Sequence, residues 1–466
     1  MRFTHWLAGA ALLAFASTAH AQTNDAGARA TAREIFETIV EMDTSVAGRQ
    51  TPAMANYLAG RFRAAGFAAE DVHVLAMGET AVLVVRYRGD GSGGRPILFL
   101  AHMDVVAAVR SDWERDPFTL IEENGFFFGR GTSDNKTGVA LLTTTFLDLR
   151  GEGFTPTRDL ILVFSGDEET NPVTTRNLLR DHRTLLGDAE FALNSDGGGG
   201  DLRESDGAAS GYFVQTAEKT FATFTLTARN PGGHSSAPRA DNAIFDLTDA
   251  IARLRAYQFP VMWNDTTLAS FSAGAEMADA EIGAALRRFA QRPGDRRAAE
   301  RLSREPGYVG QVRTTCIPTR LAAGHADNAL PQSAVATVNC RIFPGVAVAD
   351  VHAQLQRLAG ESVAVELRSD LPATDASPLR EDVMAAVTAA ARTHHPGVPI
   401  IPSQAPYYTD GMFYRAAGIA TYGVSELFMK SSDAFAHGLN ERVPVDGFYN
   451  GLDHWRVIIN ELAGRR

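Results

Sequence analysis

The chain has 466 residues, of which 45% are hydrophobic and 21% are charged, values ordinary for a globular protein. Its 44 basic and 55 acidic residues give a net charge of −11, and no basic cluster follows the pattern of a phosphate-binding surface. These features argue against nucleic acid as a partner. The length exceeds what one hydrophobic core holds, so we expect two domains of unequal size.

The N-terminus has the pattern of a secretory signal peptide. Arg2 and His5 precede an apolar run over residues 6–16, and Ala19-His-Ala21 supplies a small-x-small cleavage site. The run is too short to span a bilayer comfortably, although an uncleaved anchor is the alternative. The sequence therefore predicts a signal peptide over residues 1–21 and an exported protein, periplasmic or secreted, with no membrane span after cleavage.

The first and last parts of the chain alternate between helical and strand patterns. Helical spacing marks residues 30–66, with a break at 48–52, and a helix is expected after Gly138. Strands are expected at 81–87, 96–101, 159–164, 191–193 and 419–424, the last of these being the final strand of the chain. Such alternation predicts a mostly parallel sheet, which binds ligands beyond the carboxyl ends of its strands.

The middle of the chain has a different pattern. Strands and helices over residues 220–367 follow the order β-α-β-β-α-β, which is the ferredoxin-like unit. A charged insertion at 262–310 is expected to be helical. The predicted fold is therefore α/β, with a catalytic domain formed by residues 22–215 and 371–466 and a lid domain inserted at 216–370.

Three acidic side chains follow an apolar run near the centre of the sequence. Residues 159–164 have the pattern of a buried parallel strand, and Asp167, Glu168 and Glu169 come directly after it. Negative charge at a poorly solvated sheet edge is costly or forces protonation. A bound cation would remove that cost, whereas a solvated turn is the alternative for an isolated acidic triplet.

Other side chains of metal-binding type follow predicted strands, precede the predicted helix after Gly138 or, for His437, lie in the loop beyond the last predicted strand. They are His102, Asp104, Asp134, Asp196 and His437. Taken singly, a loop histidine near an acid or a glycine run such as 197–200 is ordinary loop structure. The glycine-rich loop before Asp134 departs from the P-loop pattern, because Lys136 occupies the place of a required glycine. Together, two imidazoles and three carboxylates suit two divalent ions that share one carboxylate.

In order along the chain, these motifs resemble those of the M20 co-catalytic zinc peptidases, a family of dipeptidases, carboxypeptidases and N-acyl-amino-acid hydrolases. The matching stretches are His102-Met-Asp104, Gly131-Thr-Ser-Asp134, Gly166-Asp-Glu-Glu169, Asp196-Gly-Gly and Ala436-His437-Gly438. The resemblance covers essentially the whole mature chain. It implies two divalent metal ions, zinc first and manganese or cobalt as alternatives, since histidine and carboxylate ligands accept all three.

The resemblance also implies roles for single residues. Asp134 would bridge the metals, with His102 and Asp196 on one ion and Glu169 and His437 on the other. Asp104 would orient His102. Glu168 would be the general base that takes a proton from the attacking water and delivers it to the leaving amine.

The lid carries further positions that match the family. By resemblance, His234 would stabilise the oxyanion, Asn328 and Arg341 would hold the substrate, and Gly411 of the catalytic domain would make a backbone contact with it. Taken alone, His234 is an ordinary turn histidine and Arg341 an ordinary strand arginine. Arg341 has the donor geometry to bind a substrate carboxylate bidentately.

Asp196 bears on the substrate class. Many carboxypeptidases and deacylases of this family carry glutamate here, whereas aspartate is more typical of its dipeptidases and aminopeptidases and is shared by some N-acyl hydrolases. We therefore expect hydrolysis of dipeptides or short peptides. An N-acyl-amino-acid amidohydrolase is the first alternative, and a non-catalytic periplasmic binding protein is a distant one. The resemblance implies a homodimer formed through the lid, but the 262–310 insertion leaves monomer and dimer both open.

The chain has two cysteines, Cys316 and Cys340. Their spacing is unlike that of a thiolate zinc site. Strands are expected on either side of a loop near residue 328, which is midway between the two cysteines. An antiparallel hairpin would then place them opposite each other, so we predict a disulfide.

Overall fold

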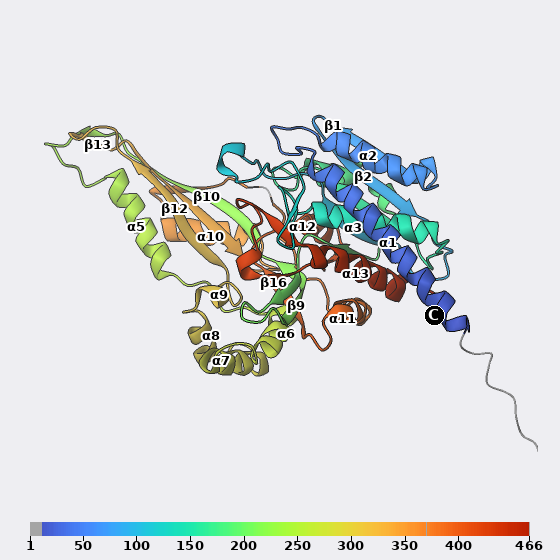
Figure 1. The fold of residues 1–466 in the computed structure, drawn as a ribbon. Coiled ribbons are helices and arrows are strands. Elements are labelled where there is room, and N and C mark those ends of the chain that lie inside the picture. Colours follow the sequence, from blue (N-terminus) through green and yellow to red (C-terminus); the bar gives the residue numbers. More distant parts are fainter. Residues whose placement is uncertain (1–11, 370, 466) are drawn as a thin grey trace, which may run out of the picture.

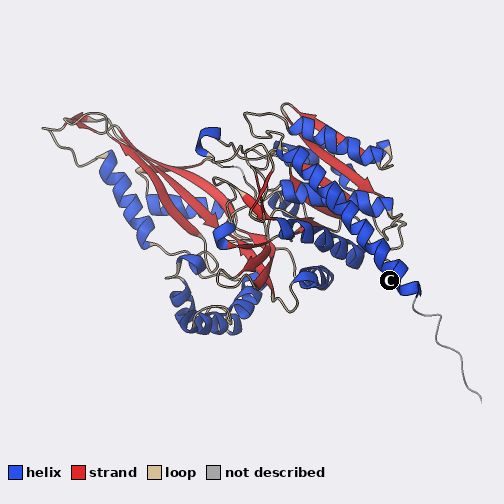
Figure 2. Cartoon of the chain, in the orientation of Figure 1, coloured by secondary structure: helices blue, strands red, loops and turns tan. Residues whose placement is uncertain are grey.

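The computed structural model describes residues 12–369 and 371–465, with side chains from residue 26 onward. Figures 1 and 2 show a large sheet covered by helices and a smaller sheet that projects from it. The first eleven residues of the expected signal peptide lie outside the described part, and the side chains of its remainder are not described. Within the described ranges, every helix is too short or too polar to cross a membrane.

Thirteen α-helices are present in the described chain. They are α1 (Leu12–Val40), α2 (Thr51–Ala64), α3 (Lys136–Gly151), α4 (Val173–Asp181), α5 (Ala243–Ala256), α6 (Asp265–Gly274), α7 (Ala280–Gln291), α8 (Arg296–Leu302), α9 (Pro306–Val309), α10 (Val348–Ala359), α11 (Glu381–His394), α12 (Gly411–Ala416) and α13 (Val445–Ala463). The strands of the large sheet are β1 (Val72–Met77), β2 (Thr80–Tyr87), β3 (Ile97–His102), β6 (Leu160–Ser165), β7 (Phe191–Asn194), β8 (Gly199–Leu202), β9 (Ala209–Glu218), β16 (Ile400–Ala405), β17 (Ala420–Gly423) and β18 (Phe428–Lys430).

The large sheet has the order β1-β2-β6-β3-β7-β17-β9-β8-β18, with β16 paired to β9. Its centre, β6-β3-β7-β17, is parallel, as the alternating pattern predicted. Apolar side chains from α1, α2, α3, α11 and α13 pack on one face, and α4 and α12 cover part of the other. The central strands are buried on both faces because helices lie on both sides of them.

The smaller sheet has the order β12-β14-β10-β15, formed by β12 (Thr315–Ala323), β14 (Ser333–Ile342), β10 (Thr220–Arg229) and β15 (Val363–Leu367). All its pairs are antiparallel, and α5 and α10 pack on one face. This is the predicted ferredoxin-like lid. At its far end, β11 (Gly233–His234) pairs with β13 (Ala329–Leu330).

The insertion at 262–310 is helical, as predicted, and forms α6 to α9 around its own apolar cluster. It also packs against the large sheet, because α6 contacts β16. Thr216 Oγ1 lies 2.6 Å from Thr266 Oγ1, and Gln311 Nε2 donates to the carbonyl of Gln404 at 3.0 Å. The insertion therefore packs on the large sheet, while the chain continues at both of its ends into lid elements, α5 before it and β12 after it (Figure 1).

Several strands of the structure were not predicted from the sequence. The expectation that residues 419–424 form the final strand was wrong, because β18 and β19 (Arg442–Pro444) follow. The strand β19 forms a small sheet with β4 (Ile121–Glu123) and β5 (Phe126–Phe128). Strands of three residues are too short for hydrophobic alternation to reveal them.

The predicted disulfide is present. Cys316 of β12 and Cys340 of β14 lie opposite each other in the antiparallel register and are bonded. The bond joins an edge strand, which is otherwise largely exposed, to a central strand of the lid.

Removing this bond should destabilise the lid. The two cysteines are 24 residues apart, and a loop of that size corresponds to about 3 kcal/mol of unfolding free energy in the chain-entropy account. We expect that loss in the Cys316→Ala/Cys340→Ala variant, measured by urea unfolding under oxidising conditions. An unchanged unfolding free energy in that variant would show that the bond does not stabilise the fold.

Candidate metal centre

The parallel centre of the large sheet brings the predicted motifs to one edge. The strand β3 pairs with β6 on one side and β7 on the other, with His102 opposite Ser165 and Leu100 opposite Asn194. His102 ends β3, the acidic triplet follows β6, and Asp196 follows β7 by two residues. These side chains therefore converge because their strands end side by side.

Two groups of ligand atoms share Asp134. In the first, His102 Nε2 lies 2.8 Å from Asp134 Oδ1 and 4.0 Å from Asp196 Oδ1. In the second, His437 Nε2 lies 3.1 Å from Asp134 Oδ2 and 2.9 Å from Glu169 Oε1. Within each group, all ligand atoms lie within 4.8 Å of one another. Asp134 thus offers one carboxylate oxygen to each group.

The electrostatics of these residues fit a pair of cations. Burial raises the pKa of Asp196 well above its ordinary value, and the nearby carboxylates of Asp134 and Glu169 add to this shift. Hydrogen bonds to Asp134 and Glu169 raise the pKa of His437 to about 10, because the two carboxylates favour positive charge at this place. Nitrogen and oxygen donors in this arrangement suit zinc, manganese or cobalt.

Asp104 holds both the histidine and the acidic turn. His102 Nδ1 lies 3.0 Å from the backbone carbonyl oxygen of Asp104 and 3.5 Å from its Oδ1. The carboxylate of Asp104 accepts the backbone N–H groups of Glu168 and Glu169 at 3.1 and 3.0 Å. The backbone carbonyl of Asp104 therefore orients the His102 ring, while the Asp104 carboxylate holds the turn that carries Glu168 and Glu169.

The three acids of the turn have separate surroundings. Asp167 accepts the backbone N–H groups of Val173 and Thr174 at 3.1 Å, at the start of α4. Glu169 pairs with His437. Glu168 is 7% exposed and lines the pocket, and burial raises its pKa well above the ordinary value, with Asp196 adding to the shift.

Glu441 is a site residue that the sequence analysis missed. Its Oε1 accepts the N–H groups of Ser133 and Asp134 at 2.8 and 3.0 Å, and its Oε2 accepts the N–H of Gly131 at 2.9 Å. Arg130 donates to the same Oε2 at 2.6 Å. Glu441 follows His437 by four residues, so this fully buried carboxylate ties the Asp134 loop to the His437 loop.

A second missed network supports Asp196. The side chain of Asn194 accepts the N–H of Asp196 and donates to its carbonyl oxygen, both at 3.1 Å. Asn194 also donates to Thr409 Oγ1 at 3.1 Å, and that hydroxyl donates to Glu218 Oε1 at 2.8 Å. Glu218 pairs with Arg415 at 2.7 Å and ends β9, directly before the lid. Single acids and amides of this kind give no motif in the sequence.

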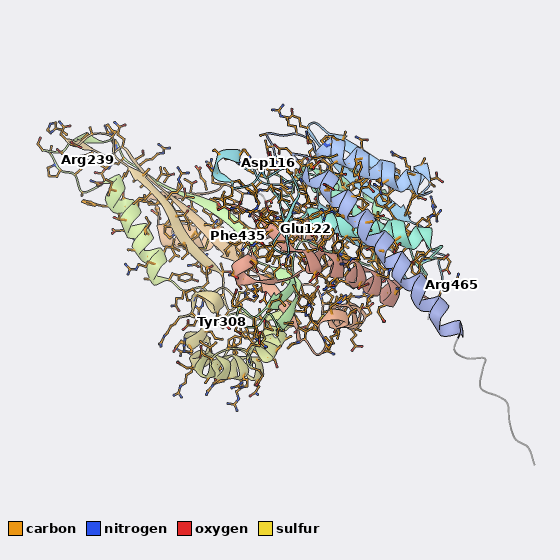
Figure 3. All side chains as sticks on the ribbon, in the orientation of Figure 1. Asp116, Glu122, Arg239, Tyr308, Phe435 and Arg465 are labelled. Carbon is orange, nitrogen blue, oxygen red and sulfur yellow. A yellow bond between two sulfur atoms is a disulfide. The ribbon has the colours of Figure 1, made fainter. Side chains whose placement is uncertain are left out.

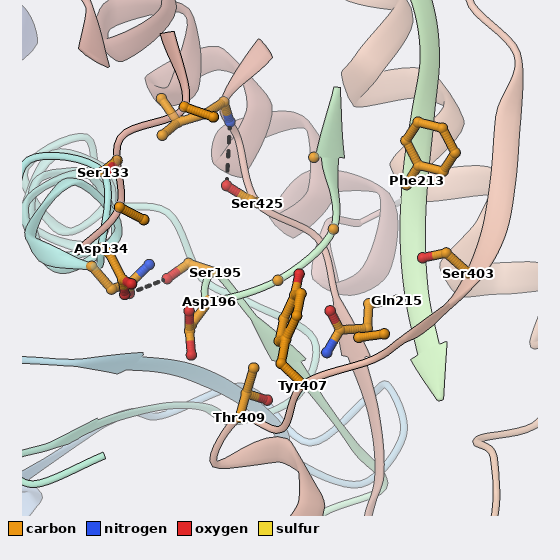
Figure 4. A pocket seen from close by; sticks show the side chains of 18 of the residues that line it. Ser133, Asp134, Ser195, Asp196, Phe213, Gln215, Ser403, Tyr407, Thr409 and Ser425 are labelled. Carbon is orange, nitrogen blue, oxygen red and sulfur yellow. Dashed lines mark hydrogen bonds between the residues drawn. The ribbon is translucent and has the colours of Figure 1, made fainter. Parts of the chain in front are cut away.

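A pocket of 880 Å³ lies over the two groups of candidate metal ligands. Figure 4 shows Asp134 and Asp196 toward one side of it and Phe213 toward the other, with Tyr407 between. Arg341 of β14 also lines this pocket, and it donates to the carbonyl oxygen of Pro406 at 2.8 Å. The structure thus places one of the four predicted substrate-binding residues in the same pocket as the candidate metal ligands.

The other three lie elsewhere. His234 and Asn328 are exposed at the far end of the lid, where the N–H of Ser235 donates to the Asn328 carbonyl oxygen at 2.9 Å. Figure 3 labels Arg239 at this end and Phe435, two residues before His437, beside the large sheet. The N–H of Gly411 donates to Thr409 Oγ1 at 3.1 Å, and Gly411 is outside the described pocket lining. Their predicted contacts with substrate stay predictions.

Replacing Glu441 should loosen metal binding. In Glu441→Gln, one side-chain oxygen becomes an NH₂ group that faces N–H donors, so part of the Asp134 loop loses its acceptor and its tie to the His437 loop weakens. Supporting residues of this kind alter metal affinity by ~10–100-fold. We expect a loss of that size in chelator competition. Glu426→Gln is the matched control, because Glu426 is also buried but bonds Trp455. Equal affinities in the two variants would contradict the role of Glu441.

Comparisons with known proteins agree with this geometry. The chain is 28% identical over 368 residues to "N-fatty-acyl-amino acid synthase/hydrolase PM20D1" of Xenopus tropicalis, covering 75% of this chain and 69% of that protein. It is 26% identical over 391 residues to "Probable carboxypeptidase S-like 2" of Dictyostelium discoideum, covering 81% and 73%.

Solved structures share the fold. The M20 family metallo-carboxypeptidase Sso-CP2 from Sulfolobus solfataricus aligns with a TM-score of 0.66 at 19% identity, covering 92% of this chain and 98% of that one. Human carnosine dipeptidase 1 aligns with a TM-score of 0.64 at 15% identity, covering 95% and 98%. Residues 98–461 match the family described as Peptidase family M20/M25/M40. The chain therefore belongs to this peptidase family and is an amide-bond hydrolase.

Proposed function

We propose that this protein is an exported, dinuclear metal-dependent hydrolase that cleaves the amide bond of N-acyl-amino acids. The observation that carries the proposal is one pocket holding three features. Two ligand groups share Asp134, the carboxyl group of Glu168 lies beside them, and Arg341 faces the same space. The assignment of residues 22–215 and 371–466 to the catalytic domain, and of 216–370 to the lid, is part of the same proposal.

The ligands fall into two sets. One ion would be held by His102 and Asp196, and the other by Glu169 and His437. Asp134 would contact both ions. When bound, two such ions polarise the amide carbonyl and lower the pKa of the attacking water. Glu168 then takes a proton from this water and delivers it to the amine nitrogen as the C–N bond breaks, which releases a carboxylic acid and an amino acid.

Substrate orientation would come from the lid. Arg341 would bind the carboxylate of the amino acid, because a guanidinium matches a carboxylate with two parallel hydrogen bonds. Its pairing with the Pro406 carbonyl uses only one of its donors. His234 would stabilise the oxyanion once it is brought to the site.

Short peptides are the second candidate substrates. Asp196 and the carboxypeptidase S-like relative favour them, whereas several relatives near 27% identity are named as N-fatty-acyl-amino acid synthase/hydrolases. Both substrate classes present a free carboxylate beside the cleaved amide. A panel of N-acetyl-amino acids and dipeptides, assayed with zinc, manganese and cobalt in turn, separates them. Faster hydrolysis of the dipeptides would reverse the order proposed here.

The Glu168→Gln variant should keep both metals and lose turnover. The amide cannot accept the proton, and general base catalysis contributes ~10²–10⁴-fold to the rate. We expect a fall in kcat of that size with unchanged metal content, measured by kinetics and elemental analysis. The neighbouring Glu169→Gln is the contrast, because it removes a ligand and should lower metal content as well. Near-normal turnover in Glu168→Gln would refute its role as the base.

His234 should act on the site of a partner subunit. It lies at the far end of the lid, so either a large closure or a second chain must bring it to the metals. Removing an oxyanion donor costs ~10²–10³ in kcat. We expect inactive His234→Ala and inactive Glu168→Gln to regain part of the wild-type activity when mixed, because a mixed dimer contains one complete site.

This complementation experiment requires subunit exchange, checked by mass spectrometry of differently tagged chains. Absence of recovery despite exchange would show that His234 acts within its own chain. In that case the lid would have to close over its own catalytic domain although the insertion at 262–310 packs on the large sheet.

A further inference from the structure

The pocket continues beyond the metal-binding groups along one strand of the large sheet. Every residue from Asp196 to Asp201 lines it, including the whole glycine run 197–200. The four residues of β8 alone span roughly 10 Å. The pocket therefore leads away from Asp196, a predicted ligand, over a backbone that has no side chains for four residues.

The glycines are required by their neighbours. A Cβ atom on Gly200 would lie 2.0 Å from the ring of Phe428, and one on Gly198 would lie 2.4 Å from the carbonyl oxygen of Gly423. Gly198 also has a φ of 73°, which other residues rarely adopt. Close packing of this strand against its neighbours thus explains the glycines and leaves a smooth floor to the pocket.

Apolar side chains flank this floor. Phe213 of β9 lies opposite Gly199, and Met429 of β18 lies opposite Asp201 at the far end. Leu427 lines the same stretch, and its carbonyl oxygen accepts the N–H of Gly200 at 2.8 Å. We call Gly197–Gly200 with Phe213, Leu427 and Met429 the acyl slot. Among the described lining residues there is no lysine, and Arg341 is the one arginine.

We propose that the acyl slot binds the unbranched apolar chain attached to the substrate carbonyl, so that the enzyme prefers medium- and long-chain N-acyl-amino acids. This rests on the proposed function. With the amide at the metals and the amino-acid carboxylate at Arg341, the acyl chain is the part of the substrate that enters the slot at Asp196. The apolar part of the slot ends at Met429, and beyond it the exposed Asp201 marks the open end.

The first test is a chain-length series. The amino acid that is cleaved fastest as its N-acetyl derivative is acylated with butanoyl, octanoyl and dodecanoyl chains. We expect kcat/KM to rise with length, by up to roughly fourfold for each fully buried methylene, and to level off once the chain passes Met429. A flat or falling series would overturn the slot.

The second test changes the slot itself. Met429→Asp should lower the ratio of dodecanoyl to acetyl kcat/KM at least roughly tenfold, because a carboxylate beside an apolar chain is costly to desolvate. Met429→Leu is the matched control and should retain the ratio. If both variants keep the wild-type ratio, the chain does not reach Met429 and the assignment is wrong.

Failure of the slot can be told apart from failure of the proposed function. Hydrolysis of N-acetyl-amino acids without any chain-length preference would leave the proposed function standing and remove the slot. If only dipeptides are cleaved, calorimetry with dodecanoate and acetate on the metal-loaded protein tests the slot without turnover. Tighter binding of dodecanoate that is weakened by Met429→Asp would support it, and equal binding of the two acids would overturn it.

Discussion

The structure depends on negative charge concentrated at the carboxyl edge of a parallel sheet. Asp134 touches His102 on one side and His437 on the other, and these contacts join segments more than 300 residues apart in the chain. Burial of so many acids is costly without compensating positive charge. The surrounding network follows from that constraint: Asp104 fixes the acidic turn, Glu441 fixes the Asp134 loop, and Asn194 fixes Asp196.

The arrangement of the two sheets divides the substrate-binding residues. Arg341 lies on a lid strand near the large sheet and lines the pocket, whereas His234 lies at the opposite end of the lid. The crossing between the sheets is compact, since β9 ends at Glu218 and β10 begins at Thr220. Lys219, buried between them, donates to the carbonyl oxygens of Gly310 and Arg313. The helical insertion is thus anchored at the crossing itself, where any closure of the lid would have to bend the chain.

Much of this architecture could be predicted from the sequence, because long apolar runs mark buried strands and the chemistry-bearing residues follow them directly. The positions of His102, Glu169 and Asp196 at one edge follow from strand ends, whereas Asp134 and His437 reach the same edge from loops. Glu441 and Glu218 could not be predicted, since their importance lies in partners far along the chain. The strands β8 and β18 could not be predicted because they are only four and three residues long. The glycine floor of the pocket, which includes the start of β8, could therefore not be predicted either. The sequence of a glycine run does not indicate which side chains flank it in the folded protein.

The proposed bridging of two metal ions by Asp134 can be observed by anomalous diffraction from crystals grown with zinc, recorded at the zinc absorption edge. We expect two peaks ~3.5–4 Å apart, one beside His102 and Asp196 and the other beside Glu169 and His437, with Asp134 contacting both. A single peak at full zinc saturation, or two peaks without Asp134 between them, would contradict it.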